Sequence, residues 1–163
     1  MSLAICPGSF DPITLGHLDI IRRASKIFDK VIVCIMYNAT KTKPMFTIDE
    51  RVELVKKAVA DYPNVEVDTY DGLLAEYAKR FDGAVLVKGM RATSDFEYEF
   101  QMNHINKKIN PALETMFLAA SEKYTFLSSS VVREMASYGA DLTGFVPPEI
   151  MAEINEKAKL WKK

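Results

Sequence analysis

Residues 3–17 read LAICPGSFDPITLGH: a short apolar run, a loop with two glycines and the start of a helix pattern. The apolar run predicts a strand over Leu3–Cys6 that ends at Pro7-Gly8. Glycines let the backbone approach a ligand closely, and a helix N-terminus offers free N–H groups and a positive dipole end to an anion. The stretch therefore predicts an anion site where the first strand turns into the first helix.

The rest of the chain repeats this alternation of apolar runs and helix patterns. Residues 16–28 place apolar side chains at helical spacing, and Val31–Met36 is an unbroken apolar run, typical of a parallel strand covered on both faces. Three more strands are predicted, over Val65–Tyr70, Ala84–Val87 and Thr115–Ala120. We expect an α/β fold over a single domain, 1–163: a Rossmann-like, doubly wound, mostly parallel five-stranded sheet with helices on both faces.

Two capping boxes mark expected helix starts. Thr47 with Glu50, and Ser94 with Glu97, have the spacing in which each side chain satisfies a free backbone N–H of the first turn. The second box predicts a helix that runs to about Ile109. We expect the aromatic residues of that helix to belong to the core rather than to stack on a base: Phe96, Tyr98 and Phe100.

Composition narrows the classes of function. The net charge of −1 gives no global basic field, so we expect neither nucleic acid nor a membrane as a partner. No apolar stretch approaches the roughly 20 residues that span a bilayer, and the first residues lack the pattern of a signal peptide. Cys6 and Cys34 lie in apolar runs and are expected to be buried thiols. These features together predict a cytoplasmic protein.

Phosphate-suited residues follow several of the predicted strands. Lysines occur at 41 and 43 after the second strand, Lys88-Gly89-Met90-Arg91 follows the fourth, and three serines, 128–130, follow the fifth at a helix start. The carboxyl ends of parallel strands meet at one edge of a sheet, where ligands bind. One such loop alone is weak evidence for a phosphate site, since serines often cap helices and lysines are often solvated. Several at one edge indicate a polyphosphate ligand.

His17 stands in the expected first turn of the first helix. There an imidazole N–H can donate to a phosphate oxygen whose charge grows in a transition state. A lone histidine at a helix start is usually structural. The neighbouring phosphate-suited loops favour the catalytic interpretation here.

Thr14-Leu15-Gly16-His17 resembles the His-x-Gly-His signature of the nucleotidyltransferase superfamily related to class I aminoacyl-tRNA synthetases. With threonine in place of the first histidine, and Pro7–Pro12 before it, the loop resembles the phosphopantetheine adenylyltransferase family of bacterial coenzyme A synthesis. Further family motifs occur in order and at family spacing: Lys41 with Pro44-Met45-Phe46, Lys88–Arg91, Asp95–Glu99 and Ser128–Ser130. The resemblance spans nearly the whole chain.

The resemblance implies two sets of contacts. ATP contacts would fall on Ser9, Phe10, His17, Gly89, Met90, Arg91, Glu99, Tyr124, Thr125, Phe126, Leu127, Ser128, Ser129 and Ser130. Contacts to the second substrate, 4′-phosphopantetheine, would fall on Ser9, Lys41, Leu74 and Lys88. Lys43 remains the alternative to Lys41.

The implied reaction transfers AMP from ATP to 4′-phosphopantetheine, giving dephospho-CoA and pyrophosphate. The attacking phosphate has its second pKa near 6, so it needs no general base at neutral pH. We therefore expect charge neutralisation and positioning: His17 on the α-phosphate, Lys41 on the acceptor phosphate, and Arg91 with the serines on the β- and γ-phosphates. The resemblance also implies Mg²⁺, a homohexamer and feedback inhibition by CoA.

Three rival functions stay open at this point. Other superfamily members adenylate nicotinate mononucleotide or transfer CMP to a small phosphate, and Thr14 argues against both. A fragment of a tRNA synthetase would be expected to carry a Lys-Met-Ser-Lys-Ser loop, which the sequence lacks. A nucleotide-binding module without catalysis would have no need for His17, Lys41 and Arg91.

Overall fold

One five-stranded sheet organises the computed structural model, which describes residues 1–37 and 43–161. The strand order is β3-β2-β1-β4-β5, and every pairing between neighbouring strands is parallel. The strands are β1 (Leu3–Gly8), β2 (Lys30–Met36), β3 (Val65–Tyr70), β4 (Val85–Met90) and β5 (Glu114–Ala119). The predicted doubly wound parallel sheet is confirmed.

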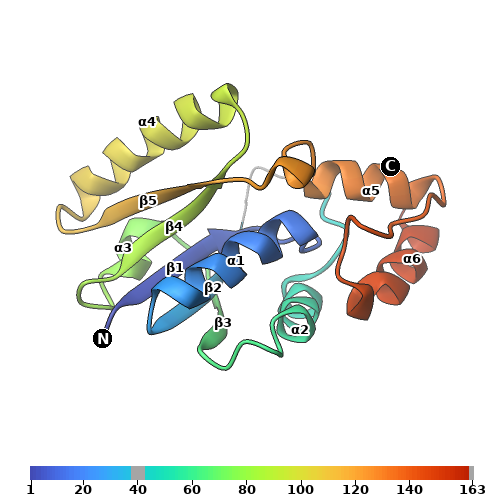
Figure 1. Cartoon of the computed structure of the whole chain (residues 1–163), viewed down its shortest axis with the longest axis horizontal. Helices are drawn as coiled ribbons and strands as arrows, with labels where there is room; N and C mark the ends of the chain where they lie inside the picture. Colours follow the sequence, from blue (N-terminus) through green and yellow to red (C-terminus); the bar gives the residue numbers. More distant parts are fainter. Residues whose placement is uncertain (38–42, 162–163) are drawn as a thin grey trace.

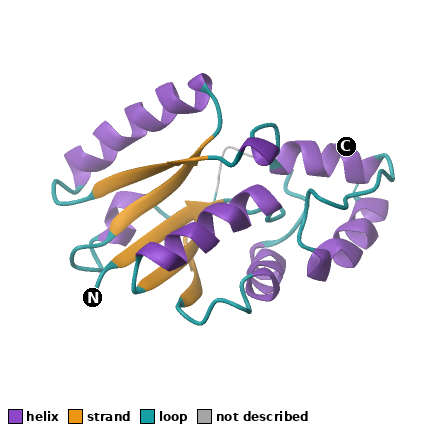
Figure 2. Cartoon of the chain, in the orientation of Figure 1, coloured by secondary structure: helices purple, strands orange, loops and turns teal. Residues whose placement is uncertain are grey.

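Helices follow the strands and cover both faces of the sheet (Figures 1 and 2). Helix α5 packs against α6, and α3 packs against α4. The helices are α1 (Leu15–Ile27), α2 (Ile48–Ala58), α3 (Leu74–Ala78), α4 (Thr93–Ile109), α5 (Ser129–Ser137) and α6 (Met151–Leu160), with short 3-10 turns at Glu122–Tyr124 and Pro148–Ile150. In the part of the chain that the structure describes, no helix has the length and apolar character to cross a membrane.

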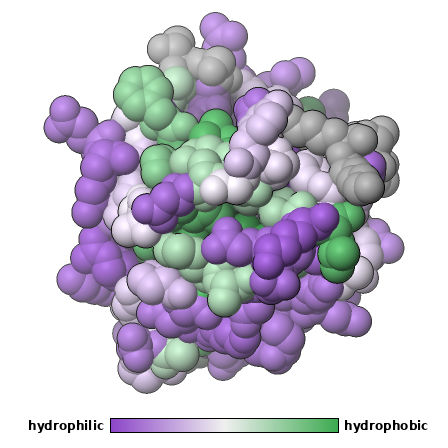
Figure 3. Space-filling model, turned by 90° about the vertical axis from the view of Figure 1, so that its right-hand side faces the viewer, coloured by the Kyte–Doolittle hydropathy of each residue, from purple (hydrophilic) through white to green (hydrophobic). Residues whose placement is uncertain are grey.

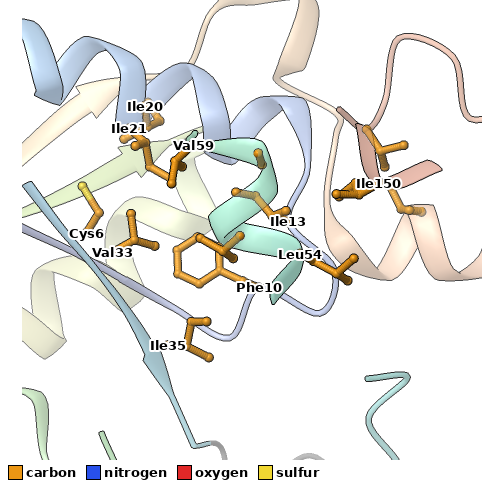
Figure 4. Packing of buried hydrophobic residues seen from close by; sticks show 14 of the residues in the cluster. Cys6, Phe10, Ile13, Ile20, Ile21, Val33, Ile35, Leu54, Val59 and Ile150 are labelled. Carbon is orange, nitrogen blue, oxygen red and sulfur yellow. The ribbon is translucent and has the colours of Figure 1, made fainter. Parts of the chain in front are cut away.

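Alternate residues of the central strands enter two separate apolar clusters. In β2, Val33 and Ile35 join the larger cluster with α1, α2, α5 and α6, whereas Ile32 and Cys34 join the smaller cluster with α3. Figure 4 shows the larger cluster, in which the ring of Phe10 packs among its apolar neighbours. This two-faced burial explains why β1 and β2 read as continuous apolar runs in the sequence.

The chain reverses its direction of winding between β1 and β4. The first three strands are laid down toward one edge, and the chain then crosses back to place β4 and β5 on the other side of β1. Ligands of doubly wound sheets bind in the crevice at this switch point, outside the carboxyl ends of the strands. The loops after β1 and β4 are therefore the first place to look for a site. The strands run toward α5 in Figure 1, so that crevice lies on the side of α5.

Two predictions about helices are corrected. The capping box at Thr47 forms as expected, but α4 begins at Thr93 with Ala92 as its N-cap, so the helix starts before Ser94, where the second start was predicted. The aromatic residues of α4 are also not core: Phe96, Tyr98 and Phe100 are 48%, 61% and 49% exposed. Because α4 packs at the edge of the sheet, against α3 and the edge strand β5, only part of its surface meets the chain.

Candidate active site

Thr14 and His17 form a reciprocal cap at the start of α1. The Thr14 hydroxyl accepts a hydrogen bond from the His17 backbone N–H at 3.3 Å, and Nδ1 of His17 accepts one from the Thr14 backbone N–H at 3.1 Å. In the usual capping box the second acceptor is a Glu or Gln side chain. Because Nδ1 is an acceptor, the neutral ring carries its proton on Nε2. The cap therefore orients a ring N–H donor at a helix N-terminus.

Phe10 supports the histidine ring from the core side. Its backbone lies in the left-handed region, with φ of 47°, and this turns its side chain inward, where it is buried. The Phe10 and His17 rings meet edge to face with centroids 5.0 Å apart. A Cβ at Gly8 would lie only 3.0 Å from the Phe10 ring, so only glycine fits there without displacing it. Phe10 therefore packs beneath the His17 ring on the core side of the loop. The resemblance placed it among the ATP contacts.

The serine loop is joined directly to the first loop. Ser129 Oγ donates to the carbonyl of Pro12 at 2.8 Å, although the two residues are 117 positions apart. Ser128 caps α5 by accepting the Val131 N–H, which is the structural role that serines at a helix start often have. Ser130 Oγ accepts from Arg133 at 3.2 Å. The predicted meeting of these loops at one sheet edge is thus seen in the structure.

Arg91 links the end of β4 to the same serine loop. Its Nη1 donates to the carbonyl of Leu127 at 2.7 Å, and its Nε donates to Asp95 at 3.1 Å. The guanidinium remains partly exposed, so it can still face an anion. Met90, at the end of β4, accepts from the N–H of Ala120 at 2.8 Å. The loops after β1, β4 and β5 are therefore held together by direct bonds.

Gly89 has an exposed backbone at the end of β4. A Cβ there would lie 2.9 Å from Cγ1 of Ile20 on α1. The strand thus approaches the first helix as closely as a glycine allows.

Lys88 and Glu99 form an ion pair that the sequence did not reveal. Nζ of Lys88 on β4 lies 2.6 Å from Oε2 of Glu99 on α4, and the two side chains are 17% and 20% exposed. The resemblance placed Glu99 among the ATP contacts and Lys88 among the contacts to the second substrate. In this structure the two side chains pair with each other. The pair leaves Lys88 positioned at the strand end beside Gly89.

The residues from Tyr124 to Phe126 form the turn before the serines. Tyr124 closes a 3-10 turn, and Thr125 Oγ1 donates to the carbonyl of Glu122 at 2.8 Å. Phe126 is 93% exposed, unusual for a phenyl ring, and stands beside the serine loop. Gly16 lies against this turn, since a Cβ there would be 3.6 Å from Tyr124.

Asp19 anchors the other end of that turn to α1. Its buried carboxylate accepts from Ser121 Oγ at 2.6 Å and from Arg22 at 2.7 Å. Burial by itself raises the pKa of Asp19, but the hydrogen bonds from Ser121 and Arg22 outweigh it and hold the pKa below its usual value. The side chain is a structural anchor, one that the sequence gave no reason to single out.

The acceptor side of the predicted site lies over β2 and β3. Lys41 falls outside the described residues, whereas Lys43 is exposed just before the buried pair Met45-Phe46. Leu74 begins α3 and packs against the smaller apolar cluster. Ser9, shared by both predicted substrates, lies in the first loop between the two halves, and its carbonyl accepts from Arg51 at 3.2 Å.

A separate cavity of about 690 Å³ lies between α2 and α6. Its lining has an apolar part, formed by Phe46, Leu54 and Leu160, and a charged part that contains five carboxylates and three lysines. Figure 3 shows the side of the molecule on which α5 and α6 lie, with apolar atoms gathered in the middle and hydrophilic ones around them. An excess of carboxylates does not suit a polyphosphate, so the strand-end loops remain the candidate site.

Comparisons with known proteins agree with this geometry. A family model described as cytidylyltransferase-like matches residues 5–135. The chain is 54% identical over 159 residues to the phosphopantetheine adenylyltransferase of Caldanaerobacter subterraneus subsp. tengcongensis, covering 98% of this chain and 99% of that one. A solved structure, of a candidate nicotinate-nucleotide adenylyltransferase from Vibrio parahaemolyticus, superposes with a TM-score of 0.69 over 97% of this chain and 95% of its own, at 22% identity, which bears on the fold alone. By sequence and by family model, the chain belongs to the phosphopantetheine adenylyltransferases, within the cytidylyltransferase-like nucleotidyltransferases.

Proposed function

We propose that this enzyme transfers AMP reversibly from ATP to 4′-phosphopantetheine, giving dephospho-CoA and pyrophosphate. One observation carries the proposal: bonds from Ser129 to Pro12 and from Arg91 to Leu127 gather three strand-end loops around the N-terminus of α1, where His17 is held with Nε2–H as its donor. Helix N-termini and glycine-rich turns are suited to phosphate. The relative with 54% identity carries the name of this activity.

In this proposal ATP lies on the half of the sheet formed by β1, β4 and β5. Its contacts are the residues that the resemblance implied: Ser9, Phe10, His17, Gly89–Arg91, Glu99 and Tyr124–Ser130. Arg91 and the serines would take the β- and γ-phosphates, since a partly exposed guanidinium beside serine hydroxyls matches their charge. Phe10 would act through the ring that it supports.

The acceptor lies on the β2 and β3 half. Lys41, or Lys43 as the alternative, would hold the acceptor phosphate together with Ser9 and Lys88, and Leu74 would contact the pantetheine arm. Lys88 is already paired with Glu99, so it would share its charge between the carboxylate and the phosphate. We expect Lys88→Met to raise the KM for 4′-phosphopantetheine more than the KM for ATP.

The chemistry is in-line attack of a phosphate oxygen on the α-phosphorus of ATP, with pyrophosphate leaving. The nucleophile is a dianion at neutral pH and needs no base, so the barrier is the approach of two anions. His17 Nε2–H would donate to an α-phosphate oxygen as charge builds there, and the loop cations would offset the repulsion.

We further propose that Mg²⁺ arrives on the triphosphate. Magnesium in such sites keeps several waters and is held largely by substrate phosphates. Among residues 1–37 and 43–161 no cluster of three or more His, Cys, Asp or Glu side chains could form a cage of its own for the ion. When bound, the metal would neutralise phosphate charge. Removal with EDTA should abolish turnover, and added MgCl₂ should restore it.

The enzyme is also proposed to be a cytoplasmic homohexamer that CoA inhibits. The exposed aromatic residues of α4 support assembly, because exposed aromatic side chains are enriched at subunit contacts: the stacked pair Phe96 and Phe100, and Tyr98. Light scattering after size exclusion should give six times the chain mass. A monomer would contradict this part alone.

The test of function is pyrophosphate release with ATP and a panel of acceptors. We expect turnover with 4′-phosphopantetheine, and no comparable rate with nicotinate mononucleotide. Turnover with nicotinate mononucleotide alone would overturn the choice of acceptor, and ATP binding without turnover of any acceptor would indicate a regulatory module.

A further inference from the structure

Asp11, which is not among the predicted substrate contacts, lies at the centre of a buried network. It is 2% exposed, and its two carboxylate oxygens accept from the backbone N–H groups of Met45 and Phe46 at 3.0 and 2.8 Å. Those two residues end the loop that begins after β2 and carries the lysines. The first loop is therefore bonded to the end of the lysine loop through one side chain.

Two arginines surround the Asp11 carboxylate and bond to its neighbours. Arg51 lies 3.6 Å from the carboxylate and donates to the carbonyl of Phe46 at 2.9 Å. Arg133 of α5 lies 3.8 Å from the other carboxylate oxygen and donates through Nη1 to the Asp11 carbonyl at 2.7 Å. Its Nη2 donates to Ser130 Oγ at 3.2 Å. The rigid guanidinium fork of Arg133 thus spans the first loop and the serine loop.

We propose that Asp11 and Arg133 are a positioning pair that sets the distance between the acceptor half and the ATP half of the site. The Asp11 side chain holds the end of the lysine loop at Met45 and Phe46. Arg133 bonds both to Ser130 of the serine loop and to the Asp11 carbonyl of the first loop. The proposal rests on the proposed function, because it needs both substrates to lie where those loops place them.

Positioning predicts a kinetic effect that simple loss of stability does not. An in-line transfer depends on the alignment of the two phosphates, and a misplacement of about 1 Å can cost on the order of 10²-fold in rate. The individual loops would still bind their own substrates in a variant that loses only the link between them. The kcat should therefore fall while both KM values change little.

The decisive variants are Arg133→Met and Arg133→Lys. We expect Arg133→Met to lower kcat by about 10- to 10²-fold, with each KM changed by less than about threefold. Lysine keeps the charge but loses the fork, so Arg133→Lys should recover part of the lost kcat. Rates should be measured well below the unfolding temperature of each variant and normalised to folded protein.

The matched control is Ile154→Ala, which opens a cavity at a buried position of α6, an element outside the three loops. It should lower stability and leave kcat unchanged. Asp11→Asn is the second probe: if it folds, its effect on kcat should be far from additive with that of Arg133→Met, because the two side chains act as one unit.

Three outcomes would overturn the proposal that Asp11 and Arg133 are a positioning pair. A rise in the KM for ATP with unchanged kcat would show that Arg133 binds ATP itself. A loss of activity in Arg133→Met that disappears when the rate is normalised to folded protein would show a structural role, and an unchanged kcat would show no role. An inactive wild-type enzyme would instead contradict the proposed function, before any variant is compared.

Discussion

His17 is the side chain on which the proposed chemistry depends most. Removing a single donor of this type typically costs about 10²- to 10³-fold in rate, so we expect His17→Ala to lower kcat by that factor. ATP binding should fall much less, since the phosphates keep Arg91 and the serine loop. Steady-state kinetics and calorimetric titration with ATP measure the two effects separately.

His104 offers the matched control, because it is the only other histidine in the sequence and lies on α4 against Phe100. His104→Ala should leave kcat unchanged. The stability of His17→Ala must be measured too, since Nδ1 also caps α1. An unchanged kcat in His17→Ala would remove the residue from its proposed role.

The two cysteines give a prediction about pH. Burial raises the pKa of both Cys6 and Cys34 to about 12 from the ordinary value near 9, and the charge of Asp68 adds to the effect at Cys34. Between those pH values the unfolded chain loses thiol protons that the native chain keeps. Stability from this source is therefore complete below pH 9 and is lost as the pH rises toward 12.

We accordingly expect native protein to resist alkylation at pH 8 and to react fully in urea. The urea midpoint should fall between pH 8 and pH 10, and it should fall less in a variant with alanine at both positions. Rapid labelling of the native protein at pH 8 would contradict the burial of these thiols.

Individual site residues differ in how far the sequence could reveal them. Arg91 and the serines were found because they follow strands, and strand ends can be read from apolar runs. Asp11 and Arg133 form their link across 122 positions of chain, which no local pattern encodes. The Thr14–His17 cap had a local signal, threonine three residues before a possible acceptor, but histidine is not the usual second member of a capping box.

At the scale of elements, the close packing of β4 against α1 can be tested at Gly89. A methyl group at Gly89 would meet Ile20 at 2.9 Å, and Ile20 is buried. Overpacking of this kind typically costs 1–3 kcal/mol, so Gly89→Ala should lower the free energy of unfolding by about that amount. Urea denaturation of the single variant measures it.

A double-mutant cycle identifies the cause. Ile20→Ala removes the atoms that the new methyl would meet, and by itself costs about 2–5 kcal/mol. If the clash is responsible, the double variant should be less destabilised than the sum of the two single variants. Additive effects would place the cost of Gly89→Ala elsewhere.

The strands could be predicted from their apolar patterns, whereas the burial of the α4 aromatic residues could not. Val31–Met36 is apolar throughout because both sheet faces are covered, and β2 follows it closely. The aromatic residues of helix α4 are left exposed by this chain, so apolar character there did not mean core. A pattern of apolar residues indicates that a surface is buried, but it does not show whether the same chain or another subunit buries it.

At the scale of the whole molecule, the switch between β1 and β4 would separate the two proposed substrates. The sequence predicted parallel strands and loops at one edge, but the order β3-β2-β1-β4-β5 depends on how the crossovers pack in three dimensions. That order places the lysine loop and the serine loop on opposite sides of the first loop. The first loop is thus the natural meeting place of donor and acceptor.

The family model stops at residue 135, whereas the larger apolar cluster continues into α6 through Ile154 and Ala158. We propose that the chain is one domain and therefore unfolds as one unit. Ile154→Ala should cost about 2–5 kcal/mol and shift the whole unfolding transition.

Cys34, in the smaller cluster on the other face of the sheet, supplies a second probe of unfolding. Far-UV ellipticity and alkylation of Cys34, followed in urea in a chain with Cys6→Ala, should shift together at fixed protein concentration. Lys159→Ala, which breaks only an exposed pair with Glu156, should move neither probe appreciably. An early loss of helix with Cys34 still protected would show that α6 unfolds separately from the sheet.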